Sequence, residues 1–394
     1  MLDFPNQRRN DLDWVRILAF ALLVPYHVGM YYVTWDWHVK SPMAGSMLEP
    51  FMILTAPWRM LLLFFISGVA TAYLKAKSSN GFLGKRSKKL LIPLIFGMLV
   101  IIPPQSYYEV VEQLPGGYHE GYLAFWWQYV SGNNSFCDAD GCLDMPTWNH
   151  LWFIAYLFFY TLLIPLARWL PSRIKEIRMD GIGILIWPVI YLIVMRLLLL
   201  ERFESTHGLT DDWYNHAQYL AAFLFGFAMT KQQSFWSALC RLRWVSVTTA
   251  ALSALFLVVY YSIYTESNPP PDALRIFQRC IWGMQQWMVP AAIMGFAYKH
   301  WRAESPVLKK LTPAIFPLYI LHQTIIVVLA HNLKALAIPP VFEGILLIII
   351  TFALCWTGYL LVRRVRWIGP LFGVTVSSRT QPNSRRASAL MPMP

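Results

Sequence analysis

Charge is scarce in this sequence. Asp, Glu, Lys and Arg make up only 14% of its 394 residues, whereas about a quarter of the residues in a typical soluble protein are charged. Apolar residues make up 57% and aromatic residues 16%, a composition too apolar for disorder over most of the length. Five cysteines are also too few for a disulfide framework. The composition therefore indicates a protein whose main solvent is lipid.

Ten apolar segments stand between polar and helix-breaking residues, and a helix needs about 20 such residues to cross a bilayer. We predict an all-α polytopic membrane helix bundle with about ten transmembrane helices. The first segment carries Arg16 and His27 and is not followed by a small-residue cleavage site, so we expect a permanent span rather than a signal peptide. The predicted spans lie near residues 14–33, 51–73, 90–110, 151–170, 181–200, 216–230, 244–264, 276–298, 313–332 and 343–362.

Lysine and arginine concentrate in alternate connections of this bundle. They gather at Arg8 and Arg9, in the connections after the second, fourth, sixth and eighth spans, and after Arg363. Because such loops stay in the cytoplasm, we predict that both termini are cytoplasmic. The net charge of +12 then reflects topology and attraction to anionic lipid, and no nucleic-acid partner is expected. Residues 1–372 are predicted to form one membrane domain, and residues 373–394 a disordered cytoplasmic tail.

The predicted outer segment 111–149 contains no lysine or arginine but has two cysteines, Cys137 and Cys142, in a turn-rich stretch. In an oxidising compartment this pair could close a small disulfide loop. The alternative is a pair of free thiols. No metal site is expected, because no spaced His or Cys pair accompanies them.

Ionisable residues inside the predicted spans are the best functional candidates, because a charge at the bilayer centre costs at least about 2.5 kcal/mol. Arg16 and His27 are eleven positions apart, so they share one helix face with an axial rise of about 16 Å. Pro25 should weaken the helix beside His27. The alternatives are an interfacial anchor for Arg16 and a buried, merely structural imidazole for His27.

Other candidates lie in later segments. Arg59 stands roughly nine residues inside the second span, where snorkelling to the headgroups is the alternative. His322 lies near the middle of the ninth span, whereas His150 and Trp152 open the fourth span at the outer surface, where aromatics also form interfacial belts. Arg86 and Lys89 lie in a basic inner loop that is either a topology signal or a phosphate-binding site.

The order of these motifs resembles the acyltransferase-3 family of membrane proteins. The resemblance spans about residues 11 to 370 and rests above all on the ten residues that separate Arg16 from His27. The shorter matches are Asp13-x-x-Arg16, Ser67-Gly68, the set Phe82, Arg86, Lys89 and Pro93, His150-Leu-Trp-Phe, and Tyr319-x-x-His322. Trp37-His38-Val39-Lys40-Ser41 and Arg59-Met60 are most similar to the glucan-biosynthesis type of this family. One departure is Lys89, where the family commonly has arginine; lysine keeps the charge but loses the bidentate fork.

The resemblance implies transfer of an acyl group, acetyl or succinyl, from cytoplasmic acyl-CoA to a hydroxyl of an extracytoplasmic glycan. We therefore expect a bacterial inner-membrane enzyme in which His27 is the general base, with a covalent acyl-His27 intermediate as the alternative. Arg59 would stabilise the oxyanion or hold the free carboxylate of a dicarboxylic acyl group. The remaining candidates bind acyl-CoA (Arg86, Lys89 and Arg16) or the glycan (His150, Trp152, His322 and His38).

A membrane transporter is the alternative from another class. Arg16, Arg59, His27 and His322 could form a proton or anion path. A transporter would not require a phosphate-binding inner loop, and it would cleave no thioester. It would also be expected to show internal symmetry, which the sequence lacks.

Overall fold

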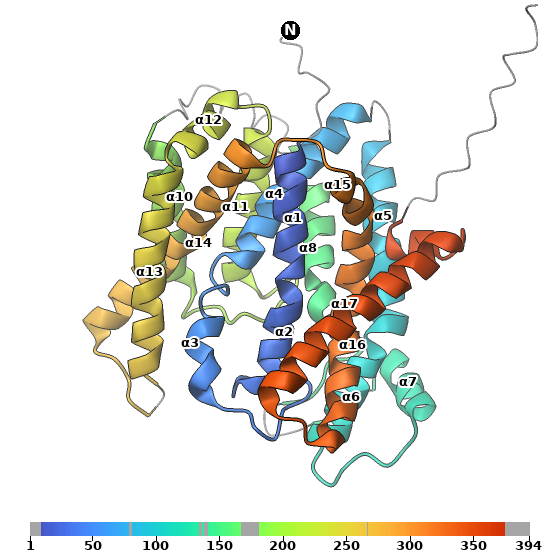
Figure 1. Cartoon of the computed structure of the whole chain (residues 1–394). Coiled ribbons are helices and arrows are strands. Elements are labelled where there is room, and N and C mark those ends of the chain that lie inside the picture. Colours follow the sequence, from blue (N-terminus) through green and yellow to red (C-terminus); the bar gives the residue numbers. More distant parts are fainter. Residues whose placement is uncertain are drawn as a thin grey trace, which may run out of the picture.

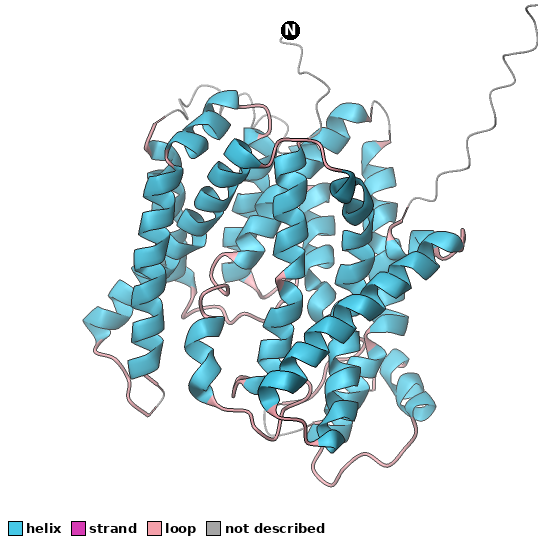
Figure 2. Ribbon diagram, in the orientation of Figure 1, coloured by secondary structure: helices cyan, strands magenta, loops and turns pink. Residues whose placement is uncertain are grey.

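The computed structural model describes residues 9–78, 81–133, 136–137, 141–166, 181–265 and 267–374. These residues form a bundle of helices joined mostly by short loops, and the only β-structure among them is two isolated bridges (Figures 1 and 2). The longer helices are α1 (Asn10–Ala21), α2 (Leu23–Tyr32), α4 (Arg59–Lys77), α5 (Phe82–Phe96), α6 (Pro103–Gln113), α7 (Tyr122–Val130), α8 (Trp152–Leu162), α10 (Gly183–Leu199), α11 (Trp213–Met229), α12 (Gln233–Arg241), α13 (Arg243–Ile263), α14 (Asp272–His300), α16 (Ile315–Leu333) and α17 (Pro340–Arg364). Short elements are α3 (Glu49–Met52), α15 (Pro306–Leu311) and η3 (Asn149–Leu151).

The fold is that of a multi-pass, all-α membrane protein. Within the described part of the chain, six helical stretches are long and apolar enough to cross a bilayer, namely Asn10–Tyr32, Arg59–Lys77, Phe82–Gln113, Arg243–Ile263, Pro306–Leu336 and Pro340–Arg364. A helix also lies within each of the other predicted spans; the described part of the span 151–170 ends at residue 166. The count of ten and the cytoplasmic position of both termini stay predictions. The basic connection at 168–178, the N-terminal residues through Arg8 and the tail from residue 375 lie outside the described residues.

The first span is interrupted at Leu22, between α1 and α2. The interruption lies one turn before Pro25, whose ring nitrogen cannot donate to the carbonyl of Ala21. The weakening expected from Pro25 is therefore seen at Leu22, one turn before the proline, and not beside His27. The interruption divides the span into a segment that carries Arg16 and a segment that carries His27.

The second span differs from its prediction. Instead of one helix over 51–73, the chain forms the short helix α3, a turn, and then α4, which begins at Arg59. Arg59 is therefore in the first turn of a helix and not roughly nine residues inside one. Pro57, two residues before Arg59, favours a helix start over a continuous helix.

Helices α4 and α11 cross closely at two glycines. A Cβ atom on Gly68 would lie 1.9 Å from the carbonyl oxygen of Phe223, and one on Gly226 would lie 2.1 Å from that of Phe65. Small residues allow such backbone contact between membrane helices. Gly68 of the Ser67-Gly68 pair therefore lies at one of these close contacts.

The segment between α6 and α8 is closed by a disulfide between Cys137 and Cys142. Of the two alternatives that the sequence left open, the structure has the bonded pair. Between α6 and this disulfide loop lies α7, at the edge of the bundle (Figure 1).

Candidate active site

Three imidazole rings meet inside the bundle. His322 of α16 lies between His27 of α2 and His150 of η3, with ring centroids 5.2 Å from each. Helices α2 and α16 pack directly against one another (Figure 1). His322 and His150 are 2% and 7% exposed, whereas His27 is half-buried. Three sequence-predicted residues thus form one cluster, and His150 is buried in protein. Its expected depth at the outer membrane surface stays a prediction.

The hydrogen bonds of the cluster define which nitrogens carry protons. Nδ1 of His322 lies 2.6 Å from the carbonyl oxygen of Tyr319, and Nε2 of His150 lies 3.1 Å from that of Ile320. A carbonyl only accepts, so these nitrogens are the donors in the neutral rings. Nε2 of His322 is then a lone-pair acceptor, and it is buried without a hydrogen-bond partner. Nδ1 of His27 is also buried without a partner.

Arg59 lies beside this cluster. Its guanidinium carbon is 3.4 Å from the ring centroid of Tyr26, the residue that precedes His27. The side chain is 8% exposed, and its Nε and Nη1 have no hydrogen-bond partner. None of the described carboxylates forms an ion pair with it. Stacking on an aromatic ring stabilises a buried cation but leaves its N–H donors free for an anion.

A chain of amides and imidazoles leads away from His150. Nε2 of Gln105 lies 3.3 Å from Nδ1 of His150, and Oε1 of Gln105 accepts from Nε2 of Gln323 at 3.2 Å. Nε2 of Gln323 also lies 3.0 Å from Nε2 of His38. The opposite nitrogen of His38, Nδ1, lies 2.6 Å from Oε2 of Glu109. A polar path therefore joins His38, another predicted residue, to the histidine cluster.

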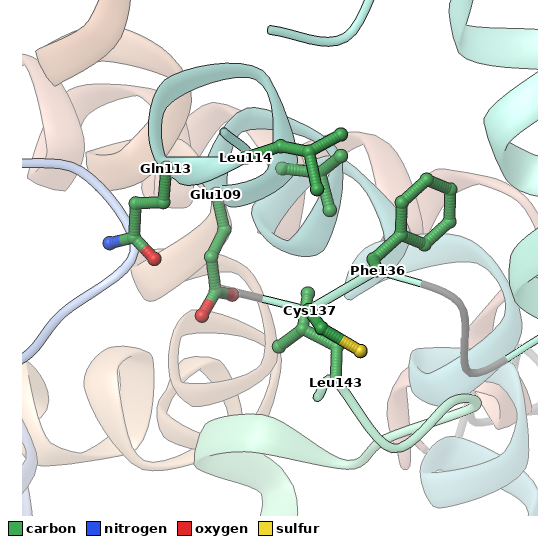
Figure 3. A pocket seen from close by; sticks show the side chains of 7 residues that line it. Glu109, Gln113, Leu114, Phe136, Cys137 and Leu143 are labelled. Carbon is green, nitrogen blue, oxygen red and sulfur yellow. The ribbon is translucent and has the colours of Figure 1, made fainter. Parts of the chain in front are cut away.

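The path ends at a small open pocket beside the disulfide loop. Glu109 and Gln113 project from α6 on one side of this pocket, and Phe136 lies on the opposite side (Figure 3). The lining residues are Glu109, Val110, Gln113, Leu114, Phe136, Cys137 and Leu143. The pocket has a polar wall and an apolar wall, but it holds no more than about one water molecule, so a sugar ring does not enter it.

Trp152 is not part of the histidine cluster. Its ring packs 4.4 Å from that of His207 and 5.6 Å from that of Tyr219, measured between centroids. Burial lowers the pKa of His207, so this contact is made by a neutral ring at neutral pH. Trp152 itself is 9% exposed.

Three cations, one from α1 and two from α5, lie close enough to influence one another. The positive charge of Arg16 repels that of Arg86, and the charges of both arginines repel the ammonium group of Lys89. Arg16 forms a 3.3 Å ion pair with Asp13, and Nε of Arg86 is buried without a partner. Lys89 is exposed. The three residues predicted to bind acyl-CoA thus form one group with excess positive charge.

Sequence reasoning missed Gln105, Gln323 and Glu109. A signal was present, because each is a polar residue within or at the end of an apolar helical run. Gln105 follows the pair Pro103-Pro104, and Gln323 follows His322 directly.

Known proteins resemble this chain in part. It is 27% identical over 173 residues to glucans biosynthesis protein C of Shigella boydii serotype 4, a match covering 44% of this chain and 41% of that protein. The proteins of the same name from Salmonella gallinarum and Escherichia coli K12 are each 26% identical, over 44% of this chain and 42% and 41% of theirs. The matched part therefore spans less than half of these relatives.

No solved structure matches the chain. Its residues 9–360, however, match the family defined by an acyltransferase domain. That match covers nearly the whole chain, and the resemblance indicated by the motifs is confirmed. The chain belongs to the acyltransferase-3 family.

Proposed function

We propose that this protein transfers an acyl group from acyl-CoA on the cytoplasmic side of the bacterial inner membrane to a hydroxyl of an extracytoplasmic glycan. The observation that carries the proposal is the cluster of His27, His322 and Arg59. It offers unpaired imidazole nitrogens beside an unpaired guanidinium within the bundle. Buried polar groups normally have partners, so such a concentration of unpaired groups marks a site that receives them from a ligand.

In the proposed reaction His27 acts as general base. It removes the proton from the acceptor hydroxyl while the oxygen attacks the thioester carbonyl. The C–O bond of the new ester forms, the C–S bond breaks, and the proton passes to the departing thiolate of CoA. Arg59 donates to the oxyanion of the tetrahedral intermediate or holds the free carboxylate of a succinyl group.

The donor would enter from the end of the bundle that carries Arg16, Arg86 and Lys89. Their mutual repulsion is relieved when phosphates of CoA bind, since arginine forms bidentate hydrogen bonds with phosphate. The arm of CoA then reaches along the first span from Arg16 towards His27, a rise of about 16 Å for eleven helical residues.

The acceptor would enter from the opposite end. Nε2 of His322 hydrogen-bonds an acceptor hydroxyl, because it has no partner within the protein. Both ring nitrogens of His38 and of His150 already bond to protein groups, so these two residues support the acceptor site through the polar path, with Trp152 as a more remote aromatic wall. The relatives named for glucan biosynthesis support a glucan as the acceptor. In this proposal residues 1–372 form the acyltransferase domain.

Substitution of His27 tests the proposal. We expect His27→Ala and His27→Gln, with folding verified, to lower acyl transfer by at least about 10²-fold, the usual contribution of a general base. His331→Gln is a matched control, because His331 lies near the C-terminal end of α16, away from His322, and pairs with Glu112. Transfer at the wild-type rate in His27→Ala would contradict the proposal. Purified wild-type protein that leaves labelled acyl-CoA intact in the presence of acceptor would favour the transporter.

A further inference from the structure

The third span contains a carbonyl group that its own helix cannot satisfy. The stretch Phe82–Gln113 includes a π-helical turn, Gly97–Ile101, followed by Pro103 and Pro104. The carbonyl of Leu99 would accept from residue 103 in an α-helix or from residue 104 in a π-helix, and proline has no N–H. An unsatisfied carbonyl inside a membrane costs several kcal/mol.

The missing donor comes from α7. The indole Nε1 of Trp126 donates to the carbonyl oxygen of Leu99 at 2.8 Å. Leu99 is 37% exposed, and its neighbours Ile95 and Val100 are 53% and 49% exposed. These apolar side chains within a membrane span face lipid. Trp126 therefore places α7 against the lipid-facing surface of the third span.

The exposed face of α7 is apolar as well. The helix Tyr122–Val130 contains no charged residue. Phe125 and Tyr129 are fully buried against the protein, whereas Leu123 and Trp127, one turn apart on the opposite face, are 80% and 68% exposed. Two such side chains in water would be an unusual exposure for an otherwise apolar helix.

The position of α7 agrees with these contacts. It lies at the edge of the bundle beside α6, and along the bundle axis it does not extend beyond the ends of α6 and α16 (Figure 1). The surface it extends is the row of exposed apolar side chains on the third span. Tryptophan and tyrosine are enriched where a bilayer meets water.

We propose that α7 is a membrane-inserted helix, with Leu123 and Trp127 embedded in the outer leaflet of the bilayer. Lipid is the occupant that fits, because the exposed face lacks charge, presents Leu123 and Trp127, and continues the row of exposed apolar side chains on the third span. The segment between the third and fourth spans is then only partly aqueous, although its sequence position makes it a loop. The inference is independent of the proposed enzymatic function.

Site-directed fluorescence in lipid nanodiscs tests this inference. Cys240, Cys280 and Cys355 are the free thiols, and they are first replaced by serine or alanine. An environment-sensitive fluorophore is then attached at Leu123→Cys or, separately, at Trp127→Cys. His119→Cys, in the exposed loop before α7, is the aqueous control; Ile349→Cys, 60% exposed on α17, is the lipid control.

We expect the fluorophores on α7 to match the lipid control. Nitroxide-labelled phosphatidylcholine should quench them, and iodide in the buffer should not. Iodide quenching equal to that at His119→Cys, at both positions and in protein of native elution volume, would overturn the inference. It would do so whether water or another cellular protein normally covers α7, because the nanodiscs contain lipid, the scaffold protein and this chain but no other partner.

Discussion

The imidazole rings of His27 and His322 lie 5.2 Å apart between centroids, although the two residues come from opposite ends of the chain. Nδ1 of His322 is committed to the carbonyl of Tyr319, so its unpaired Nε2 is left as an acceptor. A hydroxyl group needs such an acceptor for its proton. The pair thus provides two imidazoles close enough to contact one acceptor hydroxyl, and in the proposed reaction His27 is the base.

His322 is expected to bind the acceptor rather than remove its proton. His322→Ala should raise the KM for the glycan about tenfold, the loss of roughly 1.4 kcal/mol for one hydrogen bond. The KM for acyl-CoA should change little. Initial rates measured over both substrate concentrations check this, with the thermal midpoint of unfolding as a control for folding. A KM for glycan that stays at the wild-type value would contradict the assignment.

Arg59 should be required for the chemical step. Arg59→Gln removes a donor aimed at developing negative charge, and such losses lower kcat by about 10²–10³-fold. Arg59→Lys keeps the charge but not the planar fork, so it should restore only part of the rate. Assays with succinyl-CoA and acetyl-CoA separate the two proposed roles. Loss with both donors indicates oxyanion stabilisation, whereas loss with succinyl-CoA alone indicates binding of the free carboxylate.

Arg196 provides the matched control for Arg59. It is 7% exposed, its guanidinium lies 4.3 Å from the ring centroid of Trp282, and its Nη1 donates to the hydroxyl of Tyr214. Arg196→Gln removes a similar buried, stacked cation away from the histidine cluster. We expect it to lower stability but not kcat per folded molecule. Equal losses of kcat in both variants would mean that Arg59 acts only through the fold.

Much of the candidate site could be predicted from sequence, because membrane helices tolerate few ionisable residues. Arg16, His27 and His322 stand out, since ionisable residues are rare inside apolar runs. The position of Arg59 could not be predicted to within a turn, because hydropathy does not show that α3 ends and α4 begins within one apolar segment. The contact between His27 and His322 was also beyond prediction, since it depends on how α2 packs against α16. For Trp152, the sequence predicted the position at the start of α8 but not the packing against His207.

Arg86 and Lys89 are expected to act in donor binding. Arg86→Gln should raise the KM for acyl-CoA about tenfold or more and leave kcat nearly unchanged, as loss of uniform binding does. A charged hydrogen bond contributes about 1.5–3 kcal/mol. Lys89→Gln should have a smaller effect, because an exposed ammonium is a weaker phosphate ligand than a guanidinium. Lys88→Gln, an exposed neighbour on α5, should have the least effect. If Lys88→Gln and Arg86→Gln had equal KM values for acyl-CoA, the basic residues of α5 would only set the membrane topology and would not bind the donor.

Glu109 should support the acceptor site through the polar path that joins His38 to the histidine cluster. Its carboxylate accepts from Nδ1 of His38, which directs Nε2 towards Gln323. In Glu109→Gln the ring loses this anionic partner, and the KM for the glycan should rise several-fold with little change in the KM for acyl-CoA. Glu112→Gln is the matched control on the same helix, since Glu112 pairs with His331 and Lys334 instead. A glycan KM raised equally by both substitutions would assign the effect to the packing of α6.

The crossing of α4 and α11 makes a prediction about stability alone. Gly68→Ala places a methyl group 1.9 Å from the carbonyl oxygen of Phe223, so the two helices must separate. We expect a loss of about 1–3 kcal/mol in the free energy of unfolding, as for overpacked cores. Gly84→Ala is the control, because no atom lies within 4 Å of its added Cβ and alanine favours a helix more than glycine does. Denaturation of both variants in the same detergent checks this. If Gly68→Ala unfolds at the same denaturant concentration as Gly84→Ala, the backbone contact between α4 and α11 is absent in the folded protein.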